Sequence, residues 1–188
     1  MSVTAGQAGP HQGVNPLEGD RSPAIPDAER WLEECMQQHW SRVHAVLYRL
    51  LGDDGEAQDL ALEAFWRLHR RGPLANSAGW LYRVAVNLGL NALRARQRRR
   101  QYEAQAGLQA LEQTSPADPA TLLEQAEERQ RVWAALAKMK PRSASLLALR
   151  YSGVSYAEIA AALGLAASSV GALLARAEAE FERRYKGE

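Results

Sequence analysis

Apolar and polar positions repeat with a helical period from Asp27 onward, and no stretch shows the strict alternation of a half-buried strand. From Glu29 to Leu51, apolar side chains recur three and four residues apart until glycines and aspartates interrupt the pattern. The same spacing recurs in two later segments. The first ends at the Gly72-Pro73 pair, and the second begins after a short loop. The pattern predicts three helices in this half of the chain, over residues 29–51, 56–70 and 78–100.

The second half of the chain has the same period in shorter pieces, after a change of composition. Residues 101–119 are rich in glutamine, alanine and glutamate and end in a Ser-Pro-Ala-Asp-Pro run, which indicates a linker. Helical spacing then continues to Met139, Pro141 interrupts it, and shorter helices are expected over about 143–151, 156–163 and 168–183. The sequence therefore predicts an all-α protein of two small helical domains joined by a flexible linker, with boundaries at 27–101, 102–121 and 122–188.

The first 26 residues are rich in glycine, proline, glutamine and serine and contain few large apolar side chains. Such a segment buries too little surface to offset its ordering entropy, so we expect residues 1–26 to form a disordered tail. The segment lacks the charged and apolar regions of a secretory signal. The uncharged run from Ile159 to Ala175 is too short and too rich in alanine for a membrane span. We therefore expect a cytoplasmic protein without membrane insertion.

The composition disfavours an enzyme. With 188 residues, 46% apolar and 24% charged, the chain has material for one or two modest cores. Cys35 is its only cysteine, and its four histidines show no metal-ligand spacing, so we expect neither a disulfide within the chain nor a metal site. A glycine-rich phosphate loop and a serine nucleophile motif are also missing from the sequence. We expect no catalytic residue and no cofactor.

The net charge of +1 hides a strong asymmetry along the chain. Residues 1–77 carry 7 basic and 11 acidic side chains, and residues 101–188 carry 10 basic and 11 acidic ones. Residues 78–100 contain 6 arginines and no acidic residue, so this one predicted helix holds the whole positive excess. A local field of that sign attracts polyanions, and the one-sided use of arginine favours nucleic acid as the partner.

The basic helix is expected to present amide and guanidinium groups along one face. Five such residues follow one another at steps of three or four positions, which places them on one side of a helix and opposite an apolar side. Asparagine and arginine make paired hydrogen bonds to base edges, and arginine also binds phosphate. The residues predicted to bind nucleic acid here are Arg83, Asn87, Asn91, Arg94 and Arg98.

A polar loop and two aromatic residues come just before this face. Asn76 and Ser77 end the loop, and Trp80 and Tyr82 follow at the start of the helix. Small polar loops and aromatic faces suit the binding of unstacked bases, so Asn76, Ser77 and Trp80 are further candidates for contact with a single strand. Trp80 has an alternative role in the core, because aromatic side chains supply buried area more often than they form sites.

Residues 155–174 have the pattern of a helix-turn-helix. Ser155 and Glu158 can form a capping box, and Gly164 stands where the turn requires a left-handed backbone. Apolar residues on both sides of the turn can form a shared core, and the second helix of such a motif enters the major groove of DNA. The predicted duplex contacts are Ser155, Tyr156, Ser168, Ser169 and Arg176.

The expected recognition helix is poor in charge for this role. From Ser168 to Phe181 it carries one arginine and two glutamates. Because phosphate binding depends on basic side chains, we expect weak duplex binding by this half alone. The groups available to compensate are Arg142, Arg150 and the backbone amides at the start of the helix.

In their order along the chain, these motifs resemble the extracytoplasmic-function (group 4) sigma factors of bacterial RNA polymerase. Residues 52–68 (GDDGEAQDLALEAFWRL) resemble region 2.2, residues 80–94 (WLYRVAVNLGLNALR) resemble regions 2.3 and 2.4, and residues 155–177 resemble region 4.2. The resemblance covers nearly all of residues 29–186. The chain departs from the family at Leu62, where glutamine is usual, and at Gly171 and Leu173, where basic residues are usual.

This resemblance implies a subunit that binds core polymerase and directs promoter-specific transcription initiation. Region 2.2 would dock on the β′ clamp helices, and the β flap would be a further contact on the polymerase. Loop 74–77 would bind a flipped base of the melted −10 element, region 4.2 would read the −35 element, and an anti-sigma protein would be a further partner. Residues 27–101 would be sigma region 2 and residues 122–188 sigma region 4. The residues matching the clamp-binding helix are Asp59, Leu60, Glu63 and Phe65.

Two other interpretations stay open at this point. A two-domain helix-turn-helix regulator that binds duplex DNA without polymerase would account for residues 143–184 but would leave the pattern of residues 29–100 unused. A protein-interaction module would use the charge-poor recognition helix as a docking surface. Cys35 could also act as a redox switch, although a free cysteine in a helix is more often a small buried hydrophobe.

Overall fold

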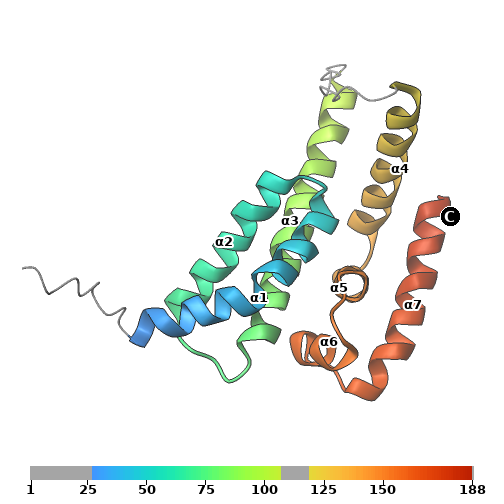
Figure 1. The fold of residues 1–188 in the computed structure, drawn as a ribbon. Helices are drawn as coiled ribbons and strands as arrows, with labels where there is room; N and C mark the ends of the chain where they lie inside the picture. The colour runs from blue at the N-terminus through green and yellow to red at the C-terminus, as the bar shows by residue number, and fades with distance from the viewer. Residues whose placement is uncertain (1–26, 107–118, 188) are drawn as a thin grey trace, which may run out of the picture.

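The computed structural model describes residues 27–106 and 119–187, and every regular element in these residues is an α-helix (Figure 1). The all-α fold class is confirmed. The expected tail, residues 1–26, and most of the expected linker lie outside the described residues. In the described part no single helix is long and apolar enough to cross a membrane, and only α6 and α7 taken together, bent by 89°, reach that length and apolarity. The helices are α1 (Asp27–Leu51), α2 (Asp54–Arg71), α3 (Ser77–Gln105), α4 (Pro119–Lys138), α5 (Pro141–Tyr151), α6 (Tyr156–Leu163) and α7 (Ala167–Lys186).

The N-terminal half, α1 to α3, is a three-helix bundle in which each helix packs against the other two. Asp53 begins α2 as its N-cap, because its Oδ1 accepts a hydrogen bond from the backbone N–H of Glu56 at 2.7 Å. Three alanines of α2, Ala57, Ala61 and Ala64, are fully buried. Their small side chains allow the neighbouring helices to approach closely. The bundle therefore fixes which face of α3 is buried and which is left outside.

Several helix ends differ from the sequence-based expectation. α3 continues to Gln105, beyond the expected end near Arg100, and α7 continues to Lys186 rather than Arg183. α5 begins at Pro141, because proline is tolerated in the first turn of a helix, where its missing N–H would have no helical partner. Because α3 continues to Gln105, the whole arginine-rich segment lies within one continuous helix.

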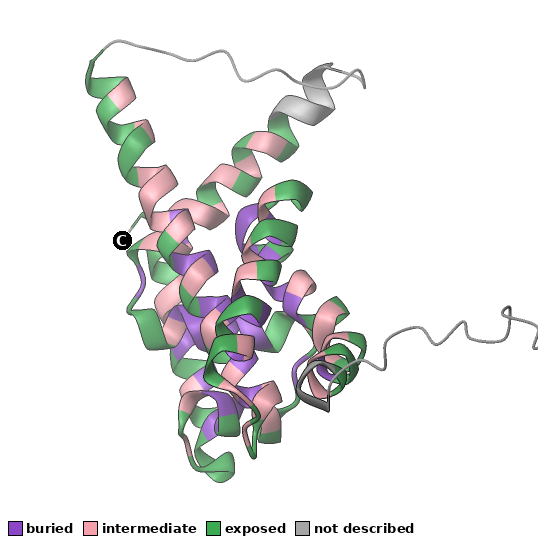
Figure 2. Ribbon diagram, turned by 90° about the vertical axis from the view of Figure 1, so that its left-hand side faces the viewer, coloured by how far each residue is buried: buried purple, intermediate pink, exposed green. Residues whose placement is uncertain are grey.

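The N-terminal half and the C-terminal half, α4 to α7, pack against each other along α3. α3 contacts α4, α5 and α6 in addition to α1 and α2, and it lies between the two halves (Figure 1). Buried apolar residues from both halves form one continuous cluster. Buried positions gather in the middle of the molecule, whereas the far ends of α3 and α4 are mostly exposed or intermediate (Figure 2). We call this packing of α3 against α4, α5 and α6 the closed arrangement.

Candidate nucleic-acid interface

The loop before α3 is held in shape by two of the predicted site residues. Asn76 is the N-cap of α3, and its Oδ1 accepts a hydrogen bond from the backbone N–H of Gly79 at 2.9 Å. The Ser77 hydroxyl donates to the Leu74 carbonyl at 3.1 Å across the same turn. Asn76 is exposed and Ser77 is half-buried. The loop therefore presents a fixed surface at the start of the basic helix.

The face of α3 predicted to bind nucleic acid points away from the core of the N-terminal half. On the opposite face, Leu81, Ala85 and Leu93 are fully buried. The division between the two faces follows the predicted register, while the binding of nucleic acid stays a prediction. We call the outer set the α3 face: Arg83, Asn87, Asn91 and Arg98 are exposed, and Arg94 is half-buried.

Trp80 and Tyr82 differ in how far they enter the core. Tyr82 is fully buried, and its ring meets the edge of the His39 ring with centroids 6.3 Å apart. Trp80 is half-buried and packs against the core cluster. The packing of Trp80 agrees with the alternative role given above, and its accessible part leaves it a candidate for stacking on a base.

Two arginines of the α3 face bind the C-terminal half. Arg83 Nε donates to the carbonyl of Ala162 at the C-terminal end of α6. Arg94 donates from Nε to the Ala137 carbonyl and from Nη2 to the Met139 carbonyl, each at 3.3 Å, at the end of α4. Carbonyls in the last turn of a helix lack an intrahelical partner, and a cation there complements the helix dipole. The α3 face is thus partly covered by α4 and α6.

The outer side of α2 carries three of the four residues predicted to contact polymerase. Asp59 is exposed, Leu60 is half-buried, and Glu63 forms an ion pair with Arg67 at 2.7 Å. Phe65 is the exception, because it is only 2% exposed and belongs to the core cluster. A side chain buried in this way does not reach a partner on the helix surface. The prediction for Phe65 is therefore corrected: the residue anchors α2 in the bundle.

Two apolar side chains of α2 that the sequence analysis did not assign are open to solvent. Leu62 is 51% exposed and Trp66 is 57% exposed. With Asp59 and Glu63 they recur at steps of three and four residues, so the four share one side of the helix. We call this acidic and apolar surface the α2 face. The sequence could have identified these two residues by their helical phase. Leu62 and Trp66 lie on a different side of the helix from the buried positions of α2.

The helix-turn-helix forms as predicted. Ser155 Oγ accepts a hydrogen bond from the Glu158 N–H at 3.3 Å, and Glu158 Oε2 accepts one from the Ser155 N–H at 2.9 Å, which completes the capping box. Gly164 ends α6 with φ of 64°, a left-handed conformation that a side chain would strain. The chain then turns into α7, and the two helices are bent by 89° relative to each other.

The helix-turn-helix exposes the side chains predicted to contact duplex DNA. Positive charge beside α7 comes partly from α5, because Arg142 lines a recess of about 430 Å³ together with Arg176 and Arg183. Arg150 lies over the ring of Tyr156, 5.4 Å from its centroid. These arginines offset part of the charge deficit of the recognition helix. The exposed residues of the predicted set are Ser155, Tyr156, Ser168, Ser169 and Arg176.

Glu158 of the capping box also joins the two halves. Its Oε1 accepts a hydrogen bond from Arg42 Nη1 of α1 at 2.8 Å. The hydrogen bond from the Ser155 hydroxyl and the charge of Arg42 lower the pKa of Glu158, so its carboxylate is ionised at neutral pH. Burial of the His39 ring, together with the nearby Arg42 charge, lowers the pKa of His39. The ion pair between Arg42 and the ionised Glu158 therefore links α1 to α6.

Comparison with known proteins gives matches to two family models and to curated relatives. The sigma-70 region 2 family matches residues 35–99, and the sigma-70 region 4 family matches residues 129–181. The ECF RNA polymerase sigma factor SigE of Mycolicibacterium smegmatis is 30% identical over 142 residues, which cover 73% of this chain and 55% of that protein. The chain thus spans about half the length of this curated relative.

A solved structure also matches the chain. It is the sigma factor RpoE of Bartonella quintana in complex with the anti-sigma factor NepR, with 20% identity, coverage of 84% of this chain and 98% of that chain, and a TM-score of 0.45. The region 2 match contains the α2 and α3 faces, and the region 4 match contains the helix-turn-helix. The chain therefore belongs to the sigma-70 family, as an extracytoplasmic-function sigma factor with regions 2 and 4.

Proposed function

We propose that this chain binds core RNA polymerase and directs promoter-specific transcription initiation by recognising −10 and −35 elements. The α3 face carries the proposal: a row of exposed asparagines and arginines begins at a capped loop and continues into an arginine-rich helix end. Sigma factors are non-enzymatic initiation factors, so the work of the chain is binding rather than bond chemistry.

The loop and the α3 face are proposed to hold the melted −10 element. Asn87 and Asn91 offer amide groups that can pair with base edges, whereas Arg98 is suited to phosphate. The accessible part of Trp80 lies one turn from Asn76, so an unstacked base in the loop would have an aromatic surface nearby. Supporting this assignment, the polar groups stand on the outer side of α3, where a strand can approach.

The α2 face is proposed to bind the clamp helices of the β′ subunit. Leu62 and Trp66 are large apolar side chains left in solvent, and exposed apolar surface of this kind marks protein contacts. The carboxylate of Asp59 stands beside them, which suits a basic partner. In this proposal Leu62 and Trp66 supply the apolar contact that the resemblance had given to Phe65.

The helix-turn-helix is proposed to read the −35 element, with low affinity when it acts alone. Arg142 and Arg176 would contact phosphates beside the groove, while Ser168 and Ser169 stand exposed in the first turn of α7. A regulator that binds duplex DNA without polymerase would need most of its affinity from this half. The limited positive charge there favours the sigma function over that alternative.

Run-off transcription tests this proposal. Fragmented genomic DNA of the host is transcribed by purified core polymerase with and without the chain, and the 5′ ends of the transcripts are mapped. We expect new ends that appear only with the chain and that share a sequence upstream. The absence of new ends, together with tight binding of a duplex site without polymerase, would support the regulator instead.

A further inference from the structure

We propose that Arg67 and Arg71, in the last turns of α2, form a phosphate-binding subsite for a nucleic-acid strand whose base is held in loop 74–77. The ligand of this subsite is the phosphodiester backbone on the flank of the strand that leaves the loop past the end of α2. The inference rests on the proposed function in one respect, because it takes the loop and the α3 face to hold a melted strand. It adds a second wall to the path of that strand.

The part of the chain without acidic residues is longer than the basic helix. From Ala64 to Tyr102 the sequence contains nine arginines, three in α2 and six in α3, and no lysine, aspartate or glutamate. The planar fork of arginine matches a phosphate with paired hydrogen bonds, whereas lysine acts as a point charge. Loop 74–77 therefore has arginines on both sides of it along the chain, and not only on the α3 side.

Helical phase places Arg67 and Arg71 on the side of α2 that borders α3. Phe65 stacks on Trp40 of α1, with ring centroids 5.9 Å apart, so Phe65 marks the side of α2 that faces α1. Arg67 follows two residues later, about 200° around the helix, and lies on the side away from α1. Arg71 is one turn further along on the same side. Since α3 is the other helix of the bundle that packs on α2, both arginines stand at its border.

The end of α2 lies beside the start of α3, because the two helices run in opposite directions. Arg96, in the C-terminal part of α3, pairs with Glu56 in the first turn of α2 at 2.6 Å. The short loop joins the other two ends of these helices (Figure 1). Arg71 stands five residues before Asn76, the N-cap of α3. A strand with one base in the loop therefore has the α3 face on one flank and the end of α2 on the other.

Both side chains have donors available for a phosphate. Arg71 is exposed, and within the described residues no side-chain hydrogen bond or ion pair engages it. Arg67 is also exposed, and its Nε donates to Glu63 at 2.7 Å, which leaves the edge formed by its two Nη groups open to a ligand. An exposed ion pair of this kind contributes little to stability, so a phosphate can also replace Glu63 as the partner.

A purely structural role would be shared by the neighbouring Arg70. Arg70 and Arg71 both lie in the last turn of α2, where a cation complements the helix dipole, and both are exposed. Arg70, however, comes four residues after Trp66 and stands on the same side of the helix as that residue. The two arginines thus share a turn and differ in the side they present. A difference between their effects on strand binding reports the subsite rather than the dipole.

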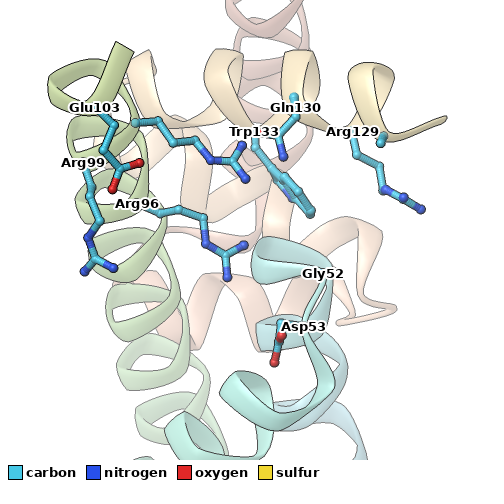
Figure 3. Close-up of a pocket in the computed structure, with 10 residues that line it drawn as sticks. Gly52, Asp53, Arg96, Arg99, Glu103, Arg129, Gln130 and Trp133 are labelled. Atoms are coloured by element: carbon cyan, nitrogen blue, oxygen red, sulfur yellow. The ribbon is translucent and has the colours of Figure 1, made fainter. Parts of the chain in front are cut away.

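The arginines around Trp133 do not form a rival phosphate site. Arg99 and Arg129 line the recess of about 460 Å³ beside this tryptophan, but both side chains point away from its centre (Figure 3). Arg96 is engaged with the Leu51 carbonyl at 2.8 Å and with a carboxylate of α2. These cations do not converge on one ligand, whereas Arg67 and Arg71 stand one turn apart on one side of a helix.

The test uses the complex of the full chain with core polymerase. Arg67→Gln/Arg71→Gln removes both charges of the subsite. The matched control is Arg49→Gln/Arg184→Gln, which removes two exposed arginines from the last turns of α1 and α7 and leaves α2 and α3 intact. Circular dichroism checks that each variant keeps its helices, and titration with core polymerase checks that each one forms the complex.

The first measurement is the affinity of this complex for single strands that carry the −10 region of a promoter mapped by run-off transcription, read by fluorescence anisotropy. We expect Arg67→Gln/Arg71→Gln to bind about 5- to 10-fold more weakly at low salt. The slope of log affinity against log salt should fall by about 0.7 for each lost phosphate contact. The control should keep both values near those of the parent, and Arg71→Gln alone should lose more affinity than Arg70→Gln.

The second measurement locates the contact on the strand. In a series of strands, one phosphate at a time is replaced by a neutral methylphosphonate. Neutralising the phosphate that Arg71 binds should weaken the parent complex by about 3-fold or more and should have little further effect on the Arg71→Gln complex. The coupled phosphates should be adjacent and lie at one end of the −10 element, because the two arginines stand one turn apart at one end of α3.

The outcomes separate the subsite from the function on which it rests. Equal losses in Arg67→Gln/Arg71→Gln and in the control, or the absence of any phosphate coupled to Arg71, overturns the inference and leaves the α3 face in place. A fall in affinity for core polymerase with unchanged strand binding also overturns it and assigns the two arginines to a protein partner. A parent complex that binds none of the strands contradicts the strand-binding function itself, and the subsite fails with it.

Discussion

At the scale of the single residue, the arginines of α3 look equivalent in the sequence but lie in three different environments in the structure. Arg96 is half-buried and donates to the Leu51 carbonyl at the end of α1 and to Glu56. Arg83 and Arg94 donate to carbonyls of the C-terminal half, and Arg98 is exposed. The sequence showed only a one-sided excess of charge, because the partners of Arg83, Arg94 and Arg96 include backbone carbonyls, which leave no mark in a sequence.

Arg96 should therefore matter for stability more than its neighbour Arg98. Arg96→Ala removes the charged cap of α1 and the partner of Glu56, and we expect a loss of about 1–3 kcal/mol in the free energy of unfolding. Arg98→Ala, the control, should change it by less than about 0.5 kcal/mol. Urea unfolding followed by circular dichroism measures both. Equal effects of the two substitutions would contradict the structural role of Arg96.

His39 gives the chain a dependence on pH. Burial and the Arg42 charge lower the pKa of His39 below its usual value of 6.5, so the unfolded chain takes up the proton at a higher pH than the folded chain. The stability that the neutral ring contributes is complete above pH 6.5 and is lost as the pH falls toward the lowered pKa.

This loss should be visible in thermal unfolding between about pH 7.5 and pH 5.5. The parent chain should melt at a lower temperature at the acidic end. His39→Gln, which carries no titrating ring, should lose less over the same interval. A parent chain and a variant with identical pH profiles would show that His39 makes no such contribution.

At the scale of the element, α2 shows how helical phase and family resemblance can disagree. The spacing of Ala64, Phe65 and Leu68 predicted one apolar side, and the structure buries all three. The resemblance assigned Phe65 to a partner as well, and the burial of that ring overturns this assignment. Phase is the better guide here because a helix presents each position to only one environment.

The α2 face yields a prediction about polymerase binding. Leu62→Ala with Trp66→Ala removes the two exposed apolar side chains, and we expect the affinity for core polymerase to fall by about 10-fold or more, as for the loss of apolar anchors in other interfaces. Tyr48→Ala is the control, since Tyr48 is 49% exposed on α1. Anisotropy of the labelled chain titrated with core polymerase gives both values. Unchanged affinity in the double variant would remove this face from the polymerase contact.

The helix-turn-helix was the most predictable element, and the reason is local chemistry. The capping box of Ser155 and Glu158 and the left-handed Gly164 are specified by residues within a few positions of one another. The ends of α3 and α7 were less predictable, because a helix that continues past its apolar stripe needs no special residue to do so. Signals that arise from neighbours in sequence can be recognised without a structure.

At the scale of the whole molecule, the closed arrangement was beyond the reach of the sequence. Each half has an apolar pattern that accounts for its own core. No feature of the sequence therefore predicts that α3 also packs against the C-terminal half. The contacts that close the halves join residues far apart in the chain, such as Arg42 with Glu158 and Gly52 with Trp133. The polar face of α3 predicted nucleic acid as its ligand, which stays a prediction, and in this structure Arg83 and Arg94 of that face donate to helix-end carbonyls of the C-terminal half.

The central claim, that α3 holds a melted promoter strand on polymerase, is tested most directly by permanganate footprinting. A promoter mapped by run-off transcription is treated with core polymerase and the chain, and unpaired thymines are detected. We predict reactive thymines in the −10 element with the parent chain and with the control Gln38→Ala on α1, and a reduction of about 10-fold or more with Asn87→Ala/Asn91→Ala. Unpaired thymines that persist in full in the double variant, or that never appear with the parent chain, would contradict the account.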